Sequence, residues 1–338
     1  MPVPDPAPRS LGRTGLAVTR IGVGLAAIGR PGYITLGRAR DLPGDRSPDA
    51  LYARTAEVLD AAIAAGVRYV DVARSYGRAE EFLARWLRER GIGPDALVVG
   101  SKWGYRYTAD WRVDAAVHEQ KELSVERFTA QLGETRARLG DRLDLYQIHS
   151  ATAESGVSSD RRLLAALAAG RRRGAYRAVG LTLSGATSAR ALEEALAARV
   201  DGERVFDVVQ ATFNCLEPSL APLLAAAHAE GMGVVAKEVF ANGRLTAANT
   251  RPEDAALVGS LRALASAVHA TPDQVAMAFV LAHPFVDVAL SGAATVAQLK
   301  SHVAATAVTL DPNDVDRLRA LAEPPPRYWA TRATLPWS

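Results

Sequence analysis

Eight short apolar runs, separated by amphipathic helical segments, constrain the fold of this chain more than any other feature of its sequence. The runs lack strict alternation of polar and apolar residues, which is typical of strands covered on both faces. They span residues 19–25, 69–73, 97–102, 143–149, 178–184, 208–214, 233–239 and 286–293. Eight strand–helix units in 338 residues predict a single α/β domain, a (β/α)8 or TIM barrel.

Residues that favour helix starts and stops mark the segments between these runs. One example is residues 218–230, where Pro218 suits a first helical turn and Gly231 suits the position after the last turn. No change in composition divides the chain, so we expect one domain over residues 1–338. Its parts are predicted as an N-terminal extension or hairpin (1–18), the barrel (19–310) and a C-terminal helix and tail (311–338).

A competing motif follows the first run. Gly22, Gly24 and Ala27 have the spacing G-x-G-x-x-A, which loosely matches a dinucleotide-binding fingerprint. That motif needs a helix to begin at once, because the helix N-terminus binds the pyrophosphate. Residues 28–48 are instead rich in glycine and proline and cannot form that helix. The barrel is therefore favoured over a Rossmann domain.

The distribution of charge argues against nucleic acid or a membrane as partner. Forty Lys and Arg face 37 Asp and Glu, a formal net charge of +3, and the basic residues are spread along the chain. The tight cluster at residues 171–173 fits the last turn of a helix ending at Gly174, where cations complement the helix dipole. The chain has no apolar stretch of about 20 residues and no secretory signal pattern at its start. We expect a cytoplasmic protein of undetermined oligomeric state.

Cysteine and lysine are both scarce. The single Cys215 excludes a disulfide within the chain and a cysteine-based zinc site, and we expect no metal. Lysine occurs four times, at 102, 121, 237 and 300. Lys102 and Lys237 lie within apolar runs, where burial shifts the pKa of an ammonium, so a chemical role for both is indicated.

Four side chains of different chemistry lie at the ends of three neighbouring runs, where a barrel carries its active site. Asp71, Lys102 and His149 end the second, third and fourth runs, and Tyr76 follows in the loop after the second. Each alone is better explained by a structural role. Together they match the needs of carbonyl reduction, because the alkoxide left by hydride transfer must be protonated as it forms.

Each of these residues has a predicted task. A phenol is a weak acid near neutrality, and the ammonium of Lys102 is expected to lower the pKa of Tyr76, the proton donor. Asp71 supplies the counter-charge for that ammonium. The imidazole of His149 orients the carbonyl oxygen.

Around these positions the sequence resembles the aldo-keto reductases. The resemblance rests on GVRYVDVARSYGRAEEFLARWL around Asp71 and Tyr76, SKWG around Lys102 and LDLYQIHS around His149, and it extends over nearly the whole barrel. It implies a TIM-barrel oxidoreductase that reduces an aldehyde or ketone, a small-molecule carbonyl substrate, to an alcohol. It also implies a nicotinamide cofactor, NADPH by family default with NADH as the alternative, bound without a Rossmann domain.

The resemblance further implies cofactor contacts on the later strands. Gln210 matches the residue that holds the nicotinamide carboxamide, and Thr182 stands where the family commonly has serine. Lys237 replaces the usual aromatic residue beside the nicotinamide, and its charge favours the neutral, reduced ring. The remaining implied contacts are Glu238, Phe240, Ser291, Gly292, Thr295, Gln298 and His302.

Two of these differences leave alternatives open. Glu238 would repel a pyrophosphate unless Lys237 or Arg244 pairs with it, and Lys237 and Glu238 could instead form a structural ion pair. The segment 291–302 contains no arginine that would bind a 2′-phosphate as a bidentate partner. The preference between NADPH and NADH is therefore open.

Two other classes of function fit parts of the sequence. A barrel hydrolase would use Asp71 and Glu238 as paired carboxylates, but Lys102 would then have no role. A cofactor-binding regulatory protein would keep the fold and bind the nucleotide with little turnover. The aromatic residues in segments predicted to face the substrate do not identify the carbonyl; they are Trp103, Tyr105, Tyr107, Trp111, Tyr328, Trp329 and Trp337.

Overall fold

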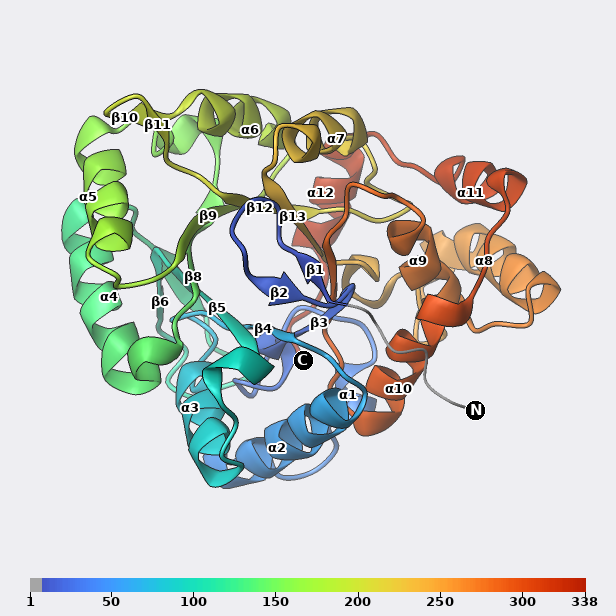
Figure 1. The fold of residues 1–338 in the computed structure, drawn as a ribbon. Coiled ribbons are helices and arrows are strands. Elements are labelled where there is room, and N and C mark those ends of the chain that lie inside the picture. Colours follow the sequence, from blue (N-terminus) through green and yellow to red (C-terminus); the bar gives the residue numbers. More distant parts are fainter. Residues whose placement is uncertain (1–7) are drawn as a thin grey trace.

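The computed structural model describes residues 8–338, and within them eight parallel strands close into one barrel surrounded by helices (Figure 1). The proline-rich residues 1–7, expected to be part of an N-terminal extension, lie outside the described residues. The barrel strands are β3 (Ile21–Gly24), β4 (Tyr69–Asp71), β5 (Val98–Trp103), β8 (Leu145–Ala151), β9 (Ala178–Leu183), β12 (Val208–Thr212), β13 (Gly233–Lys237) and β14 (Val288–Ser291).

Neighbouring strands in the barrel are consecutive along the chain, and β14 pairs with β3 to close it. Every apolar run that predicted a strand overlaps one of these eight, and β5 and β8 extend beyond the ends of their runs. The prediction of a single (β/α)8 domain is confirmed.

The helices lie outside the barrel and cover it from all sides (Figure 1). They follow the strands as α1 (Arg38–Asp41), α2 (Pro48–Ala64), α3 (Ala79–Glu89), α4 (Val125–Leu139), α5 (Arg161–Arg172), α6 (Ser188–Ala197), α7 (Ala221–Ala229), α8 (Ala255–Ala267), α9 (Pro272–Leu281) and α10 (Val296–Ala304). The predicted start of α7 at Pro218 is wrong. The helix begins three residues later, where Pro222 occupies its first turn.

A short hairpin closes the amino-terminal end of the barrel. It consists of β1 (Arg9–Ser10) and β2 (Ala17–Val18), and it crosses the centre of the view in Figure 1. Leu11, Leu16 and Val18 are buried in one apolar cluster with the residues that begin the barrel strands. The opposite end of the barrel stays open for the site.

Gly22, part of the competing dinucleotide motif, has a packing role instead. A Cβ at this position would lie 2.7 Å from the Tyr69 ring and 2.8 Å from Val288, inside the barrel. The segment after β3 forms one 3₁₀ turn over Leu25–Ala27 and no long helix. Gly22 is therefore explained by close packing between strands, and a Cβ at Gly24 would make only an ordinary contact with Ser291.

The chain ends beside the open end of the barrel. After α11 (Pro312–Arg319) and α12 (Pro325–Ala333), Trp337 forms an antiparallel bridge with Ile34, and Ser338 and Tyr33 exchange two backbone hydrogen bonds of 3.2 Å. Two further hairpins, β6 (Tyr105–Tyr107) with β7 (Glu119–Lys121) and β10 (Arg199–Val200) with β11 (Glu203–Arg204), lie outside the barrel. The tail thus packs against the loop that follows the first barrel strand.

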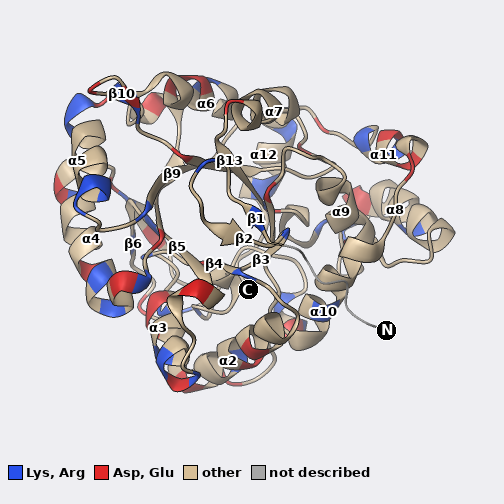
Figure 2. Ribbon diagram, in the orientation of Figure 1, with Lys and Arg blue, Asp and Glu red and all other residues tan. Residues whose placement is uncertain are grey.

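Basic and acidic residues are interspersed over the outer helices (Figure 2). Arg171 and Arg172 lie in the last turn of α5 as predicted, and Arg171 pairs with Asp207 at 2.8 Å. Among residues 8–338, no helix combines the length and apolar character needed to cross a membrane. In the same residues, no cluster of three or more His, Cys, Asp or Glu side chains is placed to hold a metal ion.

Candidate active site

Asp71 and Lys102 form a buried ion pair at the open end of the barrel. Asp71 ends β4 and Lys102 lies near the end of the adjacent β5, and the two side chains are 3% and 1% exposed. The Lys102 ammonium donates to the Asp71 carboxylate and, at 3.0 Å, to the carbonyl of Val72. Burial of both charges is tolerated because each satisfies the other.

The second oxygen of Asp71 accepts three more hydrogen bonds. Its donors are the Tyr69 hydroxyl at 3.2 Å, the Gln147 amide at 3.2 Å and the Gln210 amide at 3.0 Å. The sequence analysis missed Tyr69 and Gln147. Both lie two residues before a predicted site residue on the same strand, and side chains at that spacing share a strand face. The two-residue repeat along a strand is therefore the sequence signal that could have identified Tyr69 and Gln147.

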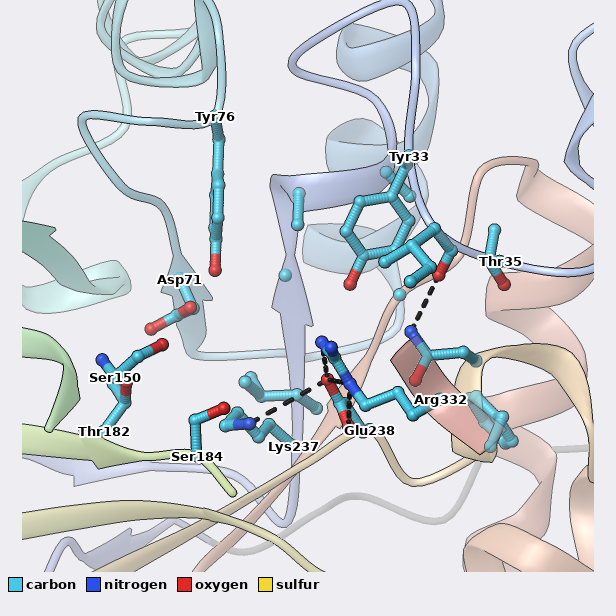
Figure 3. A pocket seen from close by; sticks show the side chains of 18 of the residues that line it. Tyr33, Thr35, Asp71, Tyr76, Ser150, Thr182, Ser184, Lys237, Glu238 and Arg332 are labelled. Carbon is cyan, nitrogen blue, oxygen red and sulfur yellow. Dashed lines mark hydrogen bonds and ion pairs between the residues drawn. The ribbon is translucent and has the colours of Figure 1, made fainter. Parts of the chain in front are cut away.

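Tyr76 and His149 meet above this ion pair. The Tyr76 hydroxyl lies 3.5 Å from Nε2 of His149, and the two rings are nearly perpendicular. The Lys102 Nζ is 4.7 Å from the centroid of the Tyr76 ring. Tyr76 enters from the loop after β4 and points its hydroxyl into the cavity toward Asp71 (Figure 3). The four residues predicted as catalytic are therefore gathered at one place.

Burial controls the protonation of this pair of rings. It raises the pKa of Tyr76 well above its ordinary value, Asp71 adds to that rise, and Arg30 opposes it. Burial also lowers the pKa of His149 well below its ordinary value, helped first by Lys102 and then by Lys237. The expectation that the pKa of Tyr76 is lowered is not met, because burial, the largest effect, raises it and Asp71 adds to that rise. Near neutrality the phenol is protonated and the imidazole is uncharged.

Gln210 and Thr182, expected at the nicotinamide, lie side by side on adjacent strands β12 and β9. The Gln210 amide nitrogen is engaged by Asp71, and Thr182 Oγ1 accepts a 2.7 Å hydrogen bond from the backbone N–H of Ser150. Both side chains are buried and line the same cavity as Tyr76 and His149. The structure thus brings them beside the four predicted catalytic residues.

Lys237 and Glu238, at the end of β13, lie on another wall of this cavity together with Arg332 from α12 (Figure 3). The guanidinium of Arg332 donates to both oxygens of Glu238, at 2.8 and 3.1 Å from Nε. Of the two cations considered as partners of Glu238, Arg244 does not pair with it, because Arg244 binds Asp254 and Glu323. Lys237 is 3.9 Å from Glu238, so the predicted contact is present but secondary.

The Arg332–Glu238 pair sets the charge on Glu238. Burial would raise the pKa of Glu238, but Arg332 and then Lys237 outweigh it and hold that pKa at about 2. The α12 residue therefore keeps a carboxylate ionised on the cavity wall.

Replacing Arg332 with methionine is expected to lower the free energy of unfolding by about 3 kcal/mol, because a buried carboxylate loses its partner. The pKa of Glu238 is depressed, so the stabilisation is full above its ordinary value of 4.5 and is lost as pH falls towards about 2. The difference in free energy of unfolding between the parent and the Arg332→Met variant should therefore become smaller at acidic pH. Urea unfolding at neutral and acidic pH measures it.

Two variants control this result. Arg327→Met removes an exposed arginine from the same helix and should leave stability unchanged. The double variant Arg332→Met with Glu238→Gln removes both charges and should recover most of the loss. A single variant as stable as the parent at neutral pH would show that the pair contributes nothing.

The residues predicted in the last strand–helix unit form a second cluster. Ser291 Oγ lies 2.8 Å from Nδ1 of His302, and the His302 ring stacks on Phe240 with centroids 4.2 Å apart. Thr295 caps α10, with its hydroxyl accepting from the N–H of Gln298. Burial lowers the pKa of His302 to about 4, so its ring is neutral at physiological pH.

Two adjoining cavities connect these clusters. The larger, 390 Å³, is lined by Asp71, Tyr76, His149, Thr182, Gln210 and Lys237 among others. The smaller, 290 Å³, lies beside α10 and is lined by Gln298, His302 and residues of α1. Both cavities are lined by Phe240 and Gly292, so the two form one elongated cleft. Thr295 is the predicted cofactor residue that lines neither, because it serves as the helix cap.

Few of the aromatic residues expected to face a substrate do so. Tyr105 and Trp337 line the larger cavity, joined by Tyr33 from the loop after β3. Trp103 is instead buried against Phe128 in the core. Trp329 contacts a small separate cavity of 30 Å³. The aromatic residues that can contact a substrate in the larger cavity therefore come from the tail, the loop after β3 and strand β6.

Comparison with known proteins relates this geometry to a family. The model of the aldo/keto reductase family matches residues 32–323, most of the chain. The chain belongs to the aldo/keto reductase family. The reaction of this family is nicotinamide-dependent carbonyl reduction, and the resemblance seen in the sequence is confirmed.

Individual relatives of this aldo/keto reductase are distant. Aldo-keto reductase str7 from Strobilurus tenacellus is 26% identical over 288 residues, which cover 79% of this chain and 80% of that protein. Pyridoxal 4-dehydrogenase from Microbacterium luteolum is 39% identical over 98 residues, 28% of this chain and 23% of that protein. The holo form of aldo-keto reductase AKR11C1 from Bacillus halodurans superposes with a TM-score of 0.73 at 19% identity, covering 94% and 97% of the two chains. That superposition shows the shared fold.

The cleft of this aldo/keto reductase fits a nicotinamide dinucleotide. A Cβ built on Gly292, where the two cavities adjoin, would meet nothing within 4 Å, so this position leaves space for a ligand. Asn242 lines the larger cavity, and its buried Oδ1 has no hydrogen-bond partner among residues 8–338. An unpaired buried acceptor is costly unless a ligand donates to it. The residues present thus provide room and an open polar contact.

Proposed function

We propose that this aldo/keto reductase reduces an aldehyde or ketone to an alcohol with NADPH, and that Tyr76 donates the proton. The observation that carries the proposal is the meeting of Tyr76 and His149 beside the buried Asp71–Lys102 pair in one cavity. The reduced nicotinamide, when bound, supplies the hydride. The protein supplies everything that positions and protonates the oxygen of the substrate.

Tyr76 and His149 form the subsite for the carbonyl oxygen. Their polar atoms are 3.5 Å apart, so one oxygen can contact both. The phenol is protonated before the reaction, and it gives up its proton as negative charge develops on that oxygen. The neutral imidazole orients the oxygen by a hydrogen bond, and its low pKa prevents it from competing as an acid.

The ion pair with Asp71 holds the positive charge of Lys102 near the ring of Tyr76. After proton transfer Tyr76 becomes a phenolate, and the ammonium near its ring stabilises that anion. Asp71 holds the ammonium in place and is itself fixed by Tyr69, Gln147 and Gln210. Gln210 and Thr182 are proposed to hold the nicotinamide end of the cofactor.

The experiment that tests this function combines binding and turnover. The purified protein is titrated with NADPH, and the quenching of its tryptophan fluorescence is measured. A panel of aliphatic and aromatic aldehydes and ketones is then added, and loss of the reduced-nicotinamide absorbance is followed. We expect saturable binding and turnover of at least one carbonyl class. Absence of NADPH binding overturns the proposal, and binding without turnover of any carbonyl supports the regulatory alternative.

A further inference from the structure

Lys237 differs from the other cations in and next to the larger cavity in how its charge is matched. Arg30, Lys102 and Arg332 each donate a hydrogen bond to a carboxylate, which is Glu119, Asp71 or Glu238. Lys237 donates instead to the neutral Thr212 hydroxyl at 2.8 Å. Among residues 8–338 its ion-pair partner is Glu238, at 3.9 Å, and that carboxylate already accepts from Arg332. The group Lys237, Glu238 and Arg332 therefore carries one net positive charge.

This charge lies where a nicotinamide ring must bind. For hydride transfer the reacting carbon atoms have to come within about 3–3.5 Å of each other. The substrate oxygen is placed at Tyr76 and His149, so the ring has to occupy the same cavity. Lys237 lines that cavity and enters it from the side opposite Tyr76 (Figure 3).

We propose that Lys237 makes the site selective for the redox state of its cofactor, so that the site binds NADPH more tightly than NADP⁺. This inference rests on the proposed function. The nicotinamide ring is neutral when reduced and carries a positive charge when oxidised. The rest of the two molecules is the same, so the ammonium changes their relative affinity through the ring alone. Two like charges a few ångströms apart in a partly buried site repel strongly.

A consequence for the reaction follows from this selectivity. A product nucleotide that is repelled leaves readily, so NADP⁺ is expected to inhibit weakly. An aromatic side chain at this position could stack on either form of the ring. Lys237 therefore acts as a residue that determines which redox state of the nucleotide is bound.

The selectivity depends on pH, because burial lowers the pKa of Lys237 to about 8. The charged groups that act on it are Glu238 beside it, Arg332 from α12, Lys102 from β5 and Asp71 from β4. His149 on β8 also faces the cavity, but its lowered pKa keeps it neutral in this range. Raising the pH through about 8 removes the charge of Lys237 and with it the discrimination.

The test measures affinity and needs no turnover. Dissociation constants of NADPH and NADP⁺ are determined by calorimetry for the parent, Lys237→Met and Lys237→Arg at neutral pH and near pH 9.5. For the parent at neutral pH we expect NADP⁺ to bind about tenfold or more weakly than NADPH. Lys237→Met should bind both forms alike, through tighter NADP⁺, and Lys237→Arg should keep the difference. Lys300→Met, which removes an exposed lysine, is the matched control and should match the parent.

A second readout comes from proton release. NADP⁺ bound beside Lys237 further lowers its pKa, so binding near pH 8 releases protons, whereas NADPH binding does not. Calorimetry in buffers with different ionisation enthalpies detects this release. Equal affinities for the two nucleotides in the parent, or a ratio unchanged in Lys237→Met, overturn the inference alone. If neither nucleotide binds the parent, the proposed function itself fails.

Discussion

Phenylalanine in place of Tyr76 is expected to lower turnover by about 10²–10⁴-fold, the usual contribution of a positioned proton donor. The ring keeps its contacts with His149, Arg30 and Lys102, because these involve the aromatic face and edge. Fold stability and NADPH affinity should therefore stay at parental values. Steady-state kinetics on the best carbonyl of the panel measure turnover, and nucleotide titration measures NADPH affinity.

The control for Tyr76→Phe is Tyr107→Phe. The Tyr107 hydroxyl is buried, has no hydrogen-bond partner among the described residues and does not line the larger cavity. Its removal should leave turnover unchanged. If Tyr76→Phe turns over at the parental rate, Tyr76 is not the proton donor and the assigned mechanism fails.

Lys102→Met is the change with the second largest expected effect, because it acts on both folding and chemistry. It leaves the Asp71 carboxylate buried without its cation, and breaking such a pair costs about 3–5 kcal/mol. The three neutral donors to Asp71 remain and reduce this loss towards the lower end of the range. Turnover should also fall sharply, since the ammonium 4.7 Å from the centroid of the Tyr76 ring no longer stabilises the phenolate.

A double variant separates these two effects. Asp71→Asn combined with Lys102→Met removes both charges while keeping the size of the side chains, so stability should largely return. Turnover should not return, because the cation beneath the phenol is still missing. Denaturant unfolding and carbonyl turnover are measured on the same preparations. Recovery of both would mean that Lys102 serves the fold alone.

The barrel strands were predictable because burial on both faces requires apolar residues over the whole strand. The same barrel geometry predicted that Asp71, Lys102 and His149 meet, since the carboxyl ends of adjacent parallel strands lie together. Boundaries that depend on turn geometry were less certain, as the displaced start of α7 illustrates. The lowered pKa expected for Tyr76 was wrong, because burial raises that pKa and burial is not a local property of the sequence.

By itself, the sequence determined the barrel, the family resemblance and the four polar residues at its open end, because these depend on local pattern and on the repeat of strand and helix. Only the tertiary structure showed that Arg332, 94 residues further along the chain, is the partner of Glu238. It likewise showed that Tyr33 lines the cavity beside Trp337, which the sequence had placed only among seven candidate aromatic residues. Contacts of this kind depend on where the tail packs against the finished barrel, and no periodicity in a chain records that. This packing brings Arg332 to Glu238 and so leaves one net positive charge on the group Lys237, Glu238 and Arg332. The proposed choice between oxidised and reduced nucleotide depends on that charge.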